Sequence, residues 1–561
     1  MSIRPTFFGF EKARSALSAA QRAIDVTGQN LANINTPGVS RQRLNLSAVG
    51  PGGLDWRHPV APSANVGRGV NMDSIRRIRD QFLDVRYRTE AGHVGRFGVI
   101  EDVLVSVENV LDEFMMDNLN ASLTNFMNAL QNFHRDSDEV EFAHLMRSAA
   151  LQLTMTLNKA GQDFADIIEL RLEQMNLIPQ MVNSIAHELD EINHELRMQT
   201  MFNPMAISNE LLDRRDLLLD QLAGFGQVTI VHDNSGPVDF MGNGTPTGGV
   251  WVFFGDVDTS GFDSEDPFSM IDELGLLVRG DRRGHSTIEF DMEEARQIMA
   301  DRLPGEVFND PIRFLWGESF PDDMPDHAGE VLMTTTGRIF GYYEMMNGFG
   351  SPDFGIGDEF RDFSAKGIPY FLIALDEFTR EFADIFNALN MDGAGIDELF
   401  VAFDDEPMGA RNITLSEEWL RNAQLIVHFI DGDDLTVVTG HDPVPSDARN
   451  SNILRMIDAL RREDRDFEAL GGFRGSFQQF IGMLNAEIAV ELDFNNTRLG
   501  MTELLMMNID QLRESVKGIS EDEEAMNLAR FQAAYNSAAR FMTVLDEMLE
   551  IIIMRMGIVG R

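Results

Sequence analysis

Residues 10–38 read FEKARSALSAAQRAIDVTGQNLANINTPG, and this stretch decides the fold of the chain. Its apolar positions recur at alternating intervals of three and four residues from Phe10 to Ile34. This heptad spacing predicts a helix about 37 Å long that packs lengthwise against another helix. A type II turn is predicted after it, because Pro37 fixes φ at the second turn position and Gly38 accepts a positive φ at the third.

The C-terminal end of the chain carries a matching apolar stripe behind a capping-box pattern, Ser520 to Glu523. A separate helix ends just before Gly518. We expect the two chain ends to be long helices that pair as a coiled coil and form an assembly interface. Periodicity alone leaves open whether this packing lies within one subunit or between subunits. The expected interface residues are Leu17, Ala20, Ile24, Thr27, Leu31, Leu528, Phe531, Tyr535, Ala538, Met542, Leu545, Leu549 and Ile552.

The middle of the chain alternates between helical and β-type patterns. Residues 81–222 and 371–389 are predicted to be mainly helical, and the chain is expected to be helical again from Asn450 to its end. Strands are predicted at 228–231 and 250–254, and a hairpin at 425–438. The fold class is therefore mainly α with β insertions: an elongated helical rod with both termini at the same end.

This pattern gives four expected regions. They are a terminal helical assembly domain (1–75 and 510–561), a helical rod domain (76–226, 331–400 and 445–509), a β-rich inserted domain (227–330) and a small β insertion (401–444).

Composition limits the classes of function. The 561 residues are 43% hydrophobic and 24% charged, as in soluble globular proteins. The net charge of −45 argues against nucleic acid and against anionic membrane surfaces as partners. Because the chain has no cysteine, disulfides and zinc–thiolate sites are excluded. The N-terminus has no apolar core or cleavage site, so we expect any export to proceed without a cleaved signal peptide.

The segment after the first stripe resembles a known motif. Asn30 to Arg41 is similar to the ANxxTxG signature of the flagellar rod, hook and hook-associated proteins, with Asn30, Asn33, Thr36, Pro37 and Gly38 as the signature turn. The C-terminal stripe is similar to the last helix of the same proteins. Val39 stands where these proteins usually have Tyr or Phe.

A second motif selects one family among these axial proteins. Residues 209–222 read NELLDRRDLLLDQL and resemble the NDLLDxRDxLxxxL helix of the hook-associated protein 1 (FlgK) family. The resemblance implies an extracellular structural subunit of the hook–filament junction. It also implies export through the flagellar type III channel and assembly into a ring of identical subunits. The implied partners are the hook protein, the second junction protein (FlgL) and an export chaperone on the C-terminal helix.

Other patterns in the sequence favour ordinary explanations. His187 and His194 lie seven residues apart on one predicted helix face, where a solvated polar surface is favoured over a metal site. Arg279-Gly280-Asp281 is read as a charged turn and not as a cell-adhesion tripeptide. We expect no catalytic, metal or cofactor site. Another axial protein, a hook or rod subunit, is the nearest alternative, and a secreted hydrolase on an axial scaffold is the alternative from a different class.

Overall fold

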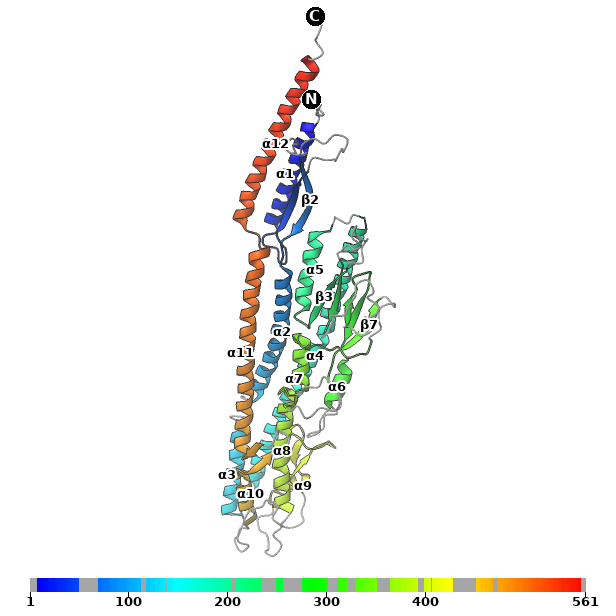
Figure 1. Cartoon of the computed structure of the whole chain (residues 1–561). Coiled ribbons are helices and arrows are strands. Elements are labelled where there is room, and N and C mark those ends of the chain that lie inside the picture. The colour runs from blue at the N-terminus through cyan, green and yellow to red at the C-terminus, as the bar shows by residue number, and fades with distance from the viewer. Residues whose placement is uncertain are drawn as a thin grey trace.

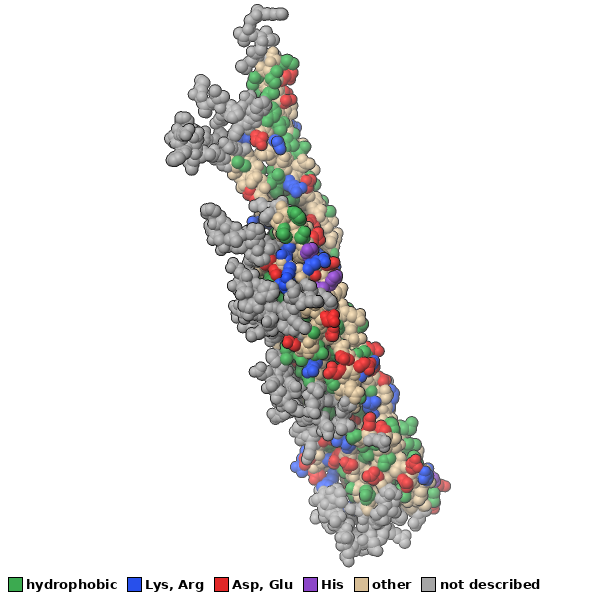
Figure 2. Space-filling model, turned by 90° about the vertical axis from the view of Figure 1, so that its right-hand side faces the viewer, with side chains coloured by type: hydrophobic (Ala, Val, Ile, Leu, Met, Phe, Trp, Pro, Cys, Tyr) green, Lys and Arg blue, Asp and Glu red, His purple; other side chains and the backbone are tan. Residues whose placement is uncertain are grey.

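The computed structural model describes residues 8–49, 69–111, 118–137, 139–202, 207–233, 249–255, 275–300, 311–320, 328–350, 364–391, 398–404, 406–426, 451–467 and 473–555. Within these ranges the molecule is an elongated rod, and both ends of the described chain lie at the same end of it (Figure 1). Acidic side chains are spread along the length of the face shown in Figure 2. The expected fold class, helical with β insertions, is confirmed.

Four elements form one end of the rod, which we call the terminal unit. They are α1 (Phe8–Ala32), β1 (Gln42–Ala48), β2 (Val70–Arg77) and α12 (Glu521–Arg555). The two helices pack along each other, and the antiparallel hairpin β1–β2 packs on α1. The hairpin lies inside the region expected to be helical and was not predicted, because its sequence lacks a run of β-branched residues.

The helices of the rod follow the terminal unit. An antiparallel pair, α2 (Gln81–Val110) and α11 (Phe477–Lys517), lies directly below it (Figure 1). The long α4 (Val140–Phe202) spans about 95 Å, as its 63 residues require. The remaining helices are α3 (Asn120–Arg135), α5 (Asn209–Leu222), α6 (Met292–Ala300), α7 (Gly337–Asn347), α8 (Ile368–Met391), α9 (Glu417–Arg421) and α10 (Ser451–Arg461).

The larger β insertion is one antiparallel sheet whose strands pair in chain order. The strands are β3 (Val228–His232), β4 (Val250–Phe254), β5 (Leu276–Val278), β6 (His285–Glu289) and β7 (Leu315–Phe320). All five side chains of β4 are buried, which explains its uninterrupted apolar sequence. The two strands predicted from the sequence, 228–231 and 250–254, are confirmed.

The structure corrects one prediction for the last third of the chain and bears on two others. The chain is not helical from Asn450 onward, because β10 (Arg465–Phe467) and β11 (Phe473–Gly475) form a hairpin between α10 and α11. The first residue of the hairpin predicted at 425–438, Leu425, ends the 3₁₀ turn Ala423–Leu425, and residues 427–438 lie outside the described residues. A different pair, β8 (Phe400–Ala402) and β9 (Ile413–Leu415), forms the small β insertion. Helix α11 also runs through residue 510, where a domain boundary was expected, as far as Lys517.

Asparagines join the helices to the β segments. In the described residues five helix asparagines each accept a hydrogen bond from the backbone N–H of one residue and donate one to the C=O of that same residue, at 2.8–3.3 Å. Four of the partners lie in strands, where the carboxamide replaces one residue of a neighbouring strand, and the fifth, Ile312, lies three residues before β7. The pairs are Asn30 with Gln42, Asn183 with Ile288, Asn193 with Val250, Asn347 with Ile312, and Asn387 with Phe400.

Removing one of these carboxamides should loosen the sheet locally. Asn193→Leu leaves the buried N–H and C=O of Val250 without this partner, which costs about 2 kcal/mol. We expect amide hydrogens of the sheet to exchange about 30-fold faster in the variant, as measured by mass spectrometry. The exposed Glu195→Ala on the same helix is the control. Equal exchange in Asn193→Leu and the wild-type protein would show that the carboxamide does not hold the sheet.

Candidate functional site

The two terminal helices, α1 and α12, pack along each other. The chain directions are opposed, since Asn30 of α1 contacts Glu524 at the start of α12 while Gly9 contacts Leu545 near its end. A Cβ atom on Gly9 would lie 2.9 Å from Leu545 Cδ2, so the helices touch closely there. The predicted positions of α12 from Leu528 to Leu549 are half-buried, and Ile552 is 41% exposed. On α1, Ala20 and Thr27 are buried, and Leu17, Ile24 and Leu31 are half-buried.

Helix α12 has a second apolar stripe beside the first one, and it is more exposed. It comprises Phe541, Val544, Met548 and Ile551, which are 46%, 49%, 57% and 53% exposed. These residues repeat the spacing of the first stripe but precede it by one position, which turns them about 100° around the helix. A helix with two such faces is built to contact two neighbours, and the described chain supplies one of them.

The signature turn links α1 to the rest of the molecule. Gly38 has φ of 82°, as the predicted type II turn requires, and Val39 N–H donates to Thr36 C=O at 3.4 Å. Gly38 also packs on α5, because a Cβ atom placed on it would lie 3.3 Å from Leu217 Cβ. Asn33 and Thr36 hold the turn from outside through a 3.3 Å hydrogen bond between their side chains. Glycine is therefore required at position 38 both by the positive φ and by the close approach of Leu217.

A small cluster of polar groups ties this turn to α12. Asn30 donates to the carboxylate of Glu524 at 3.2 Å, and Glu524 is only 2% exposed. The guanidinium of Arg41 binds Glu524 at 2.8 Å and Glu523 at 2.7 Å. The backbone N–H of Arg41 donates to Lys517 C=O, the last residue of α11, at 2.9 Å. The signature asparagine therefore joins α1, β1 and α12 at one point.

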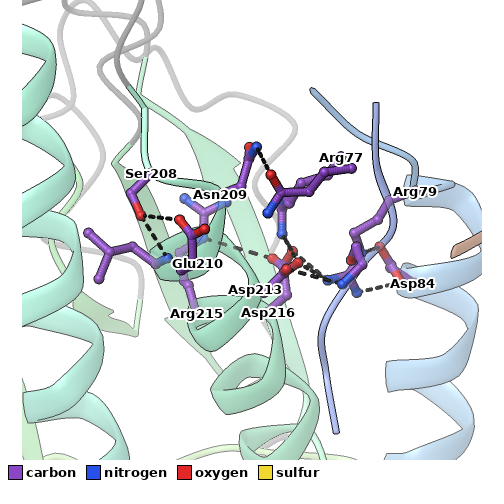
Figure 3. Close-up of polar contacts among 12 residues, drawn as sticks. Arg77, Arg79, Asp84, Ser208, Asn209, Glu210, Asp213, Arg215 and Asp216 are labelled. Carbon is purple, nitrogen blue, oxygen red and sulfur yellow. Dashed lines mark hydrogen bonds and ion pairs between the residues drawn. The ribbon is translucent and has the colours of Figure 1, made fainter. Parts of the chain in front are cut away.

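The motif helix α5 presents carboxylates to the place where the terminal unit meets the rod. We call this place, where α5 contacts the end of β2 and the start of α2, the joint (Figure 3). Asp213, Asp216 and Asp220 lie three and four residues apart and share one helix face. Arg77 binds Asp213 and Asp216, each at 2.8 Å, and Arg79 binds Asp216 at 2.7 Å. Asp213 also accepts a 3.1 Å hydrogen bond from the backbone N–H of Ser40. The family motif thus fastens the signature turn and the β2–α2 connection to the rod.

The network continues to the two helices below the terminal unit. Arg513 of α11 binds Asp84 of α2 at 2.9 Å and Asp220 of α5 at 2.6 Å. Arg79 also binds Asp84 at 3.0 Å, and Arg88 binds Asp220 at 2.8 Å. The joint therefore ties α2, α5 and α11 together with buried, charge-assisted hydrogen bonds.

Asp216 and Arg215 are both charged at neutral pH. Burial opposes ionisation of Asp216, but the positive charges led by Arg215 and Arg79 outweigh it and lower its pKa to about 2. Burial lowers the pKa of Arg215 to about 10, which still leaves it protonated at pH 7. A proton-transfer centre needs a group that titrates near the working pH. Asp216 and Arg215 are suited to holding elements together.

An open groove lies beside the joint. Its volume is about 1160 Å³, and its lining combines arginines and aspartates of the network with apolar side chains such as Phe82 and Leu219. His232 also lines it, and burial together with the charge of Arg215 lowers the pKa of this histidine, so it is neutral at pH 7. A smaller pocket of about 300 Å³ adjoins the signature turn and includes Val39. Val39 is thus found at the edge of a partly open space.

Two other sequence patterns have structural explanations. The guanidinium of Arg279, fully buried, is bound by Asp281 at 2.7 and 2.8 Å, so this tripeptide is a closed turn. His187 lies on α4 beside Glu191 at 3.7 Å and against the ring of His285. Among the described residues no group of three metal-ligating side chains converges. None of the described helices is both long and apolar enough to cross a bilayer.

Sequence reasoning missed the polar half of the site. These residues come from three elements and two connections, and no spacing pattern groups them: Arg41, Arg77, Arg79, Glu524 and Arg513. The chain has 91 acidic residues, so single carboxylates carry little information before the fold is known. The spacing of the three aspartates on α5 was the available signal.

Comparison with known proteins agrees with this geometry. The family model for the flagellar hook-associated protein FlgK helical domain matches residues 104–247, and the model for the flagella basal body rod protein matches residues 10–38. Flagellar hook-associated protein 1 of Bacillus subtilis strain 168 is 26% identical over 567 residues, which cover 99% of each chain. The Escherichia coli K12 protein of the same name is 21% identical and covers 96% of this chain and 98% of its own.

A solved structure shares the fold. The flagellar hook junction protein FlgK from Burkholderia pseudomallei superposes with a TM-score of 0.52 at 11% identity. The alignment covers 77% of this chain and all of that one. Together with the sequence matches, this confirms the resemblance to hook-associated protein 1.

The joint should be sensitive to loss of one carboxylate. Asp216→Asn leaves Arg77 and Arg79 without this partner, and we expect unfolding of the rod to become easier by about 3 kcal/mol at pH 7. Because the folded pKa of about 2 lies below the ordinary 3.8, the carboxylate stabilises the fold above about pH 4, and its contribution is lost as pH falls through 2.

Urea unfolding at a series of pH values measures this effect. The gap between the variant and the wild-type protein should narrow as pH falls from 4 toward 2. Asp25→Asn, an exposed change on α1, is the control and should leave stability unchanged. A gap that is absent at pH 7, or that stays constant at low pH, would contradict the role of Asp216.

Proposed function

We propose that this chain, whose likeness to flagellar hook-associated protein 1 extends along its whole length, is a structural subunit of the junction between the hook and the filament of the bacterial flagellum. It works by packing and carries out no chemistry. The single observation that supports this most strongly is the terminal unit. Two long helices from opposite ends of the chain are paired there, and an apolar stripe of α12 is still exposed.

The two stripes of α12 have different tasks. The stripe from Leu528 to Ile552 holds α12 on α1 within the subunit and so gives the terminal unit its shape. The stripe from Phe541 to Ile551 is the surface left for a neighbour, since bare apolar stripes of this kind mark association sites. The assembly interface expected from sequence thus divides into an internal seam and an outward face.

The partners follow from the same proposal. Copies of this chain form a ring by contact between their terminal units, with the hook protein on one side and the second junction protein (FlgL) on the other. The subunit acts outside the cell, and it reaches that place through the flagellar export channel without a cleaved signal peptide. An export chaperone covers the apolar C-terminal helix before assembly, when that helix would otherwise expose both stripes.

The alternatives have less support. The motif helix of residues 209–222 lies on the rod as α5, which favours a hook-associated protein over a hook or rod subunit. A hydrolase on this scaffold would need titratable groups that converge on a cleft. The groove beside the joint instead has arginines and aspartates bound to one another.

The internal seam can be tested at Leu545, which covers Gly9. Burying a leucine is worth about 1.5–3 kcal/mol, and a carboxylate forced into the same place costs several more. We expect Leu545→Asp to abolish filament attachment and swimming while the rod stays folded by circular dichroism.

Glu547→Ala is the matched control, because Glu547 is exposed and lies two residues further on, at about 200° around the helix. This variant should assemble and swim nearly normally. Normal swimming by Leu545→Asp, or an equally severe defect in Glu547→Ala, would show that α12 does not pack as proposed.

A further inference from the structure

The outward stripe of α12 lies on one side of a three-layer unit. In Figure 1, α12, α1 and the β1–β2 hairpin lie side by side in that order. The contacts agree, since α1 packs against α12 on one side and against both hairpin strands on the other. The unit therefore has two outer faces, one formed by α12 and one by the hairpin.

The middle layer offers no partner for the stripe. One face of α1 is taken by α12, and a second, formed by Ala19, Ala23 and Val26, is buried. The rest of its surface is polar. Its exposed positions include Glu11, Arg14, Ser18, Gln21, Arg22 and Asp25.

The hairpin has an apolar patch on its outer face. Leu46 and Met72 are directly paired across the strands and are 47% and 44% exposed. The ladder skips Asp73 between the Asn45–Ser74 and Leu46–Met72 pairs, so β2 carries one extra residue directly beside this patch. Every exposed large apolar side chain of the described terminal unit lies either on α12 or at these two positions.

We infer that the outward stripe of α12 in one subunit docks on the outer face of the hairpin in a second copy of this chain. This inference rests on the proposed function and names the two surfaces that meet. The contact is heterologous, because two different faces join, and such contacts propagate around a ring. It covers the apolar residues of both faces, which a contact between two α12 helices would not do.

Charge supports this pairing, and distances along α1 give the offset between the two patches. Near the joint the first turn of α12 exposes Glu521 and Asp522, whereas the hairpin exposes Arg43 and Arg76. The outer end of the hairpin lies beside Ser15, whose hydroxyl accepts from Val70 N–H at 3.4 Å. Ser15 is six residues, or about 9 Å, along α1 from Gly9, where Leu545 lies. Counted from Gly9 toward the joint, Phe541 lies about 6 Å and Met72 about 16 Å along the unit, which is a separation of about two helical turns.

The natural absence of cysteine makes the test direct. Met72→Cys and Phe541→Cys are introduced singly and together, and flagella are treated with a short dithiol-reactive cross-linker. We expect the chain with both cysteines to give a ladder of covalent oligomers. Each single variant should stay monomeric by itself, and a mixture of the two should give dimers that contain one of each.

Gln21→Cys combined with Met72→Cys is the control and should give no ladder, because Gln21 lies on the polar face of α1. Dimers formed by Phe541→Cys alone would overturn the inference in favour of contact between two α12 helices. The doubly substituted chain could instead be found at the hook tip, in cells with attached filaments, and still give no cross-links. That result would overturn the inference but leave the proposed function standing. Absence of the wild-type protein from the hook tip would instead refute the proposed function, and the inference with it.

Discussion

A helix can be fastened to a β segment only if the backbone groups at the edge of that segment find partners. This chain meets the requirement with asparagine. Asn193 on α4 holds β4 of the larger sheet, and Asn387 on α8 holds the small β insertion. Asn30, the first signature residue, holds β1 in the same way. The placement of these β segments on the helices relies on this one interaction, since an unpaired buried amide would cost as much as the contact provides.

Sequence reasoning located the regular elements well. The heptad stripe of α12 is an example, because its half-buried positions are largely those chosen by spacing alone. The apolar run of β4 was equally readable. Such elements carry their burial pattern in consecutive residues, so a period of two or 3.6 exposes them.

What the sequence did not reveal depends on contacts between distant residues. The β1–β2 hairpin has a polar sequence and is an ordered element chiefly because it covers α1. Arg77 and Asp213 are 136 residues apart, and nothing local to either one marks the pair. The split of the α12 surface into a seam and an outward face also required the structure, because two stripes one position apart look like one broad apolar face.

The chain passes between the terminal unit and the rod twice, at residues 78–80 and again at residues 518–520. The helices on either side of these passages, α2 and α11, are clamped to each other where Arg513 meets Asp84. A single linker would act as a swivel, and torque applied to the rod would be lost in bond rotation. Two parallel linkers anchored on a braced pair of helices resist twisting, so rotation imposed at one end of the subunit is delivered to the other.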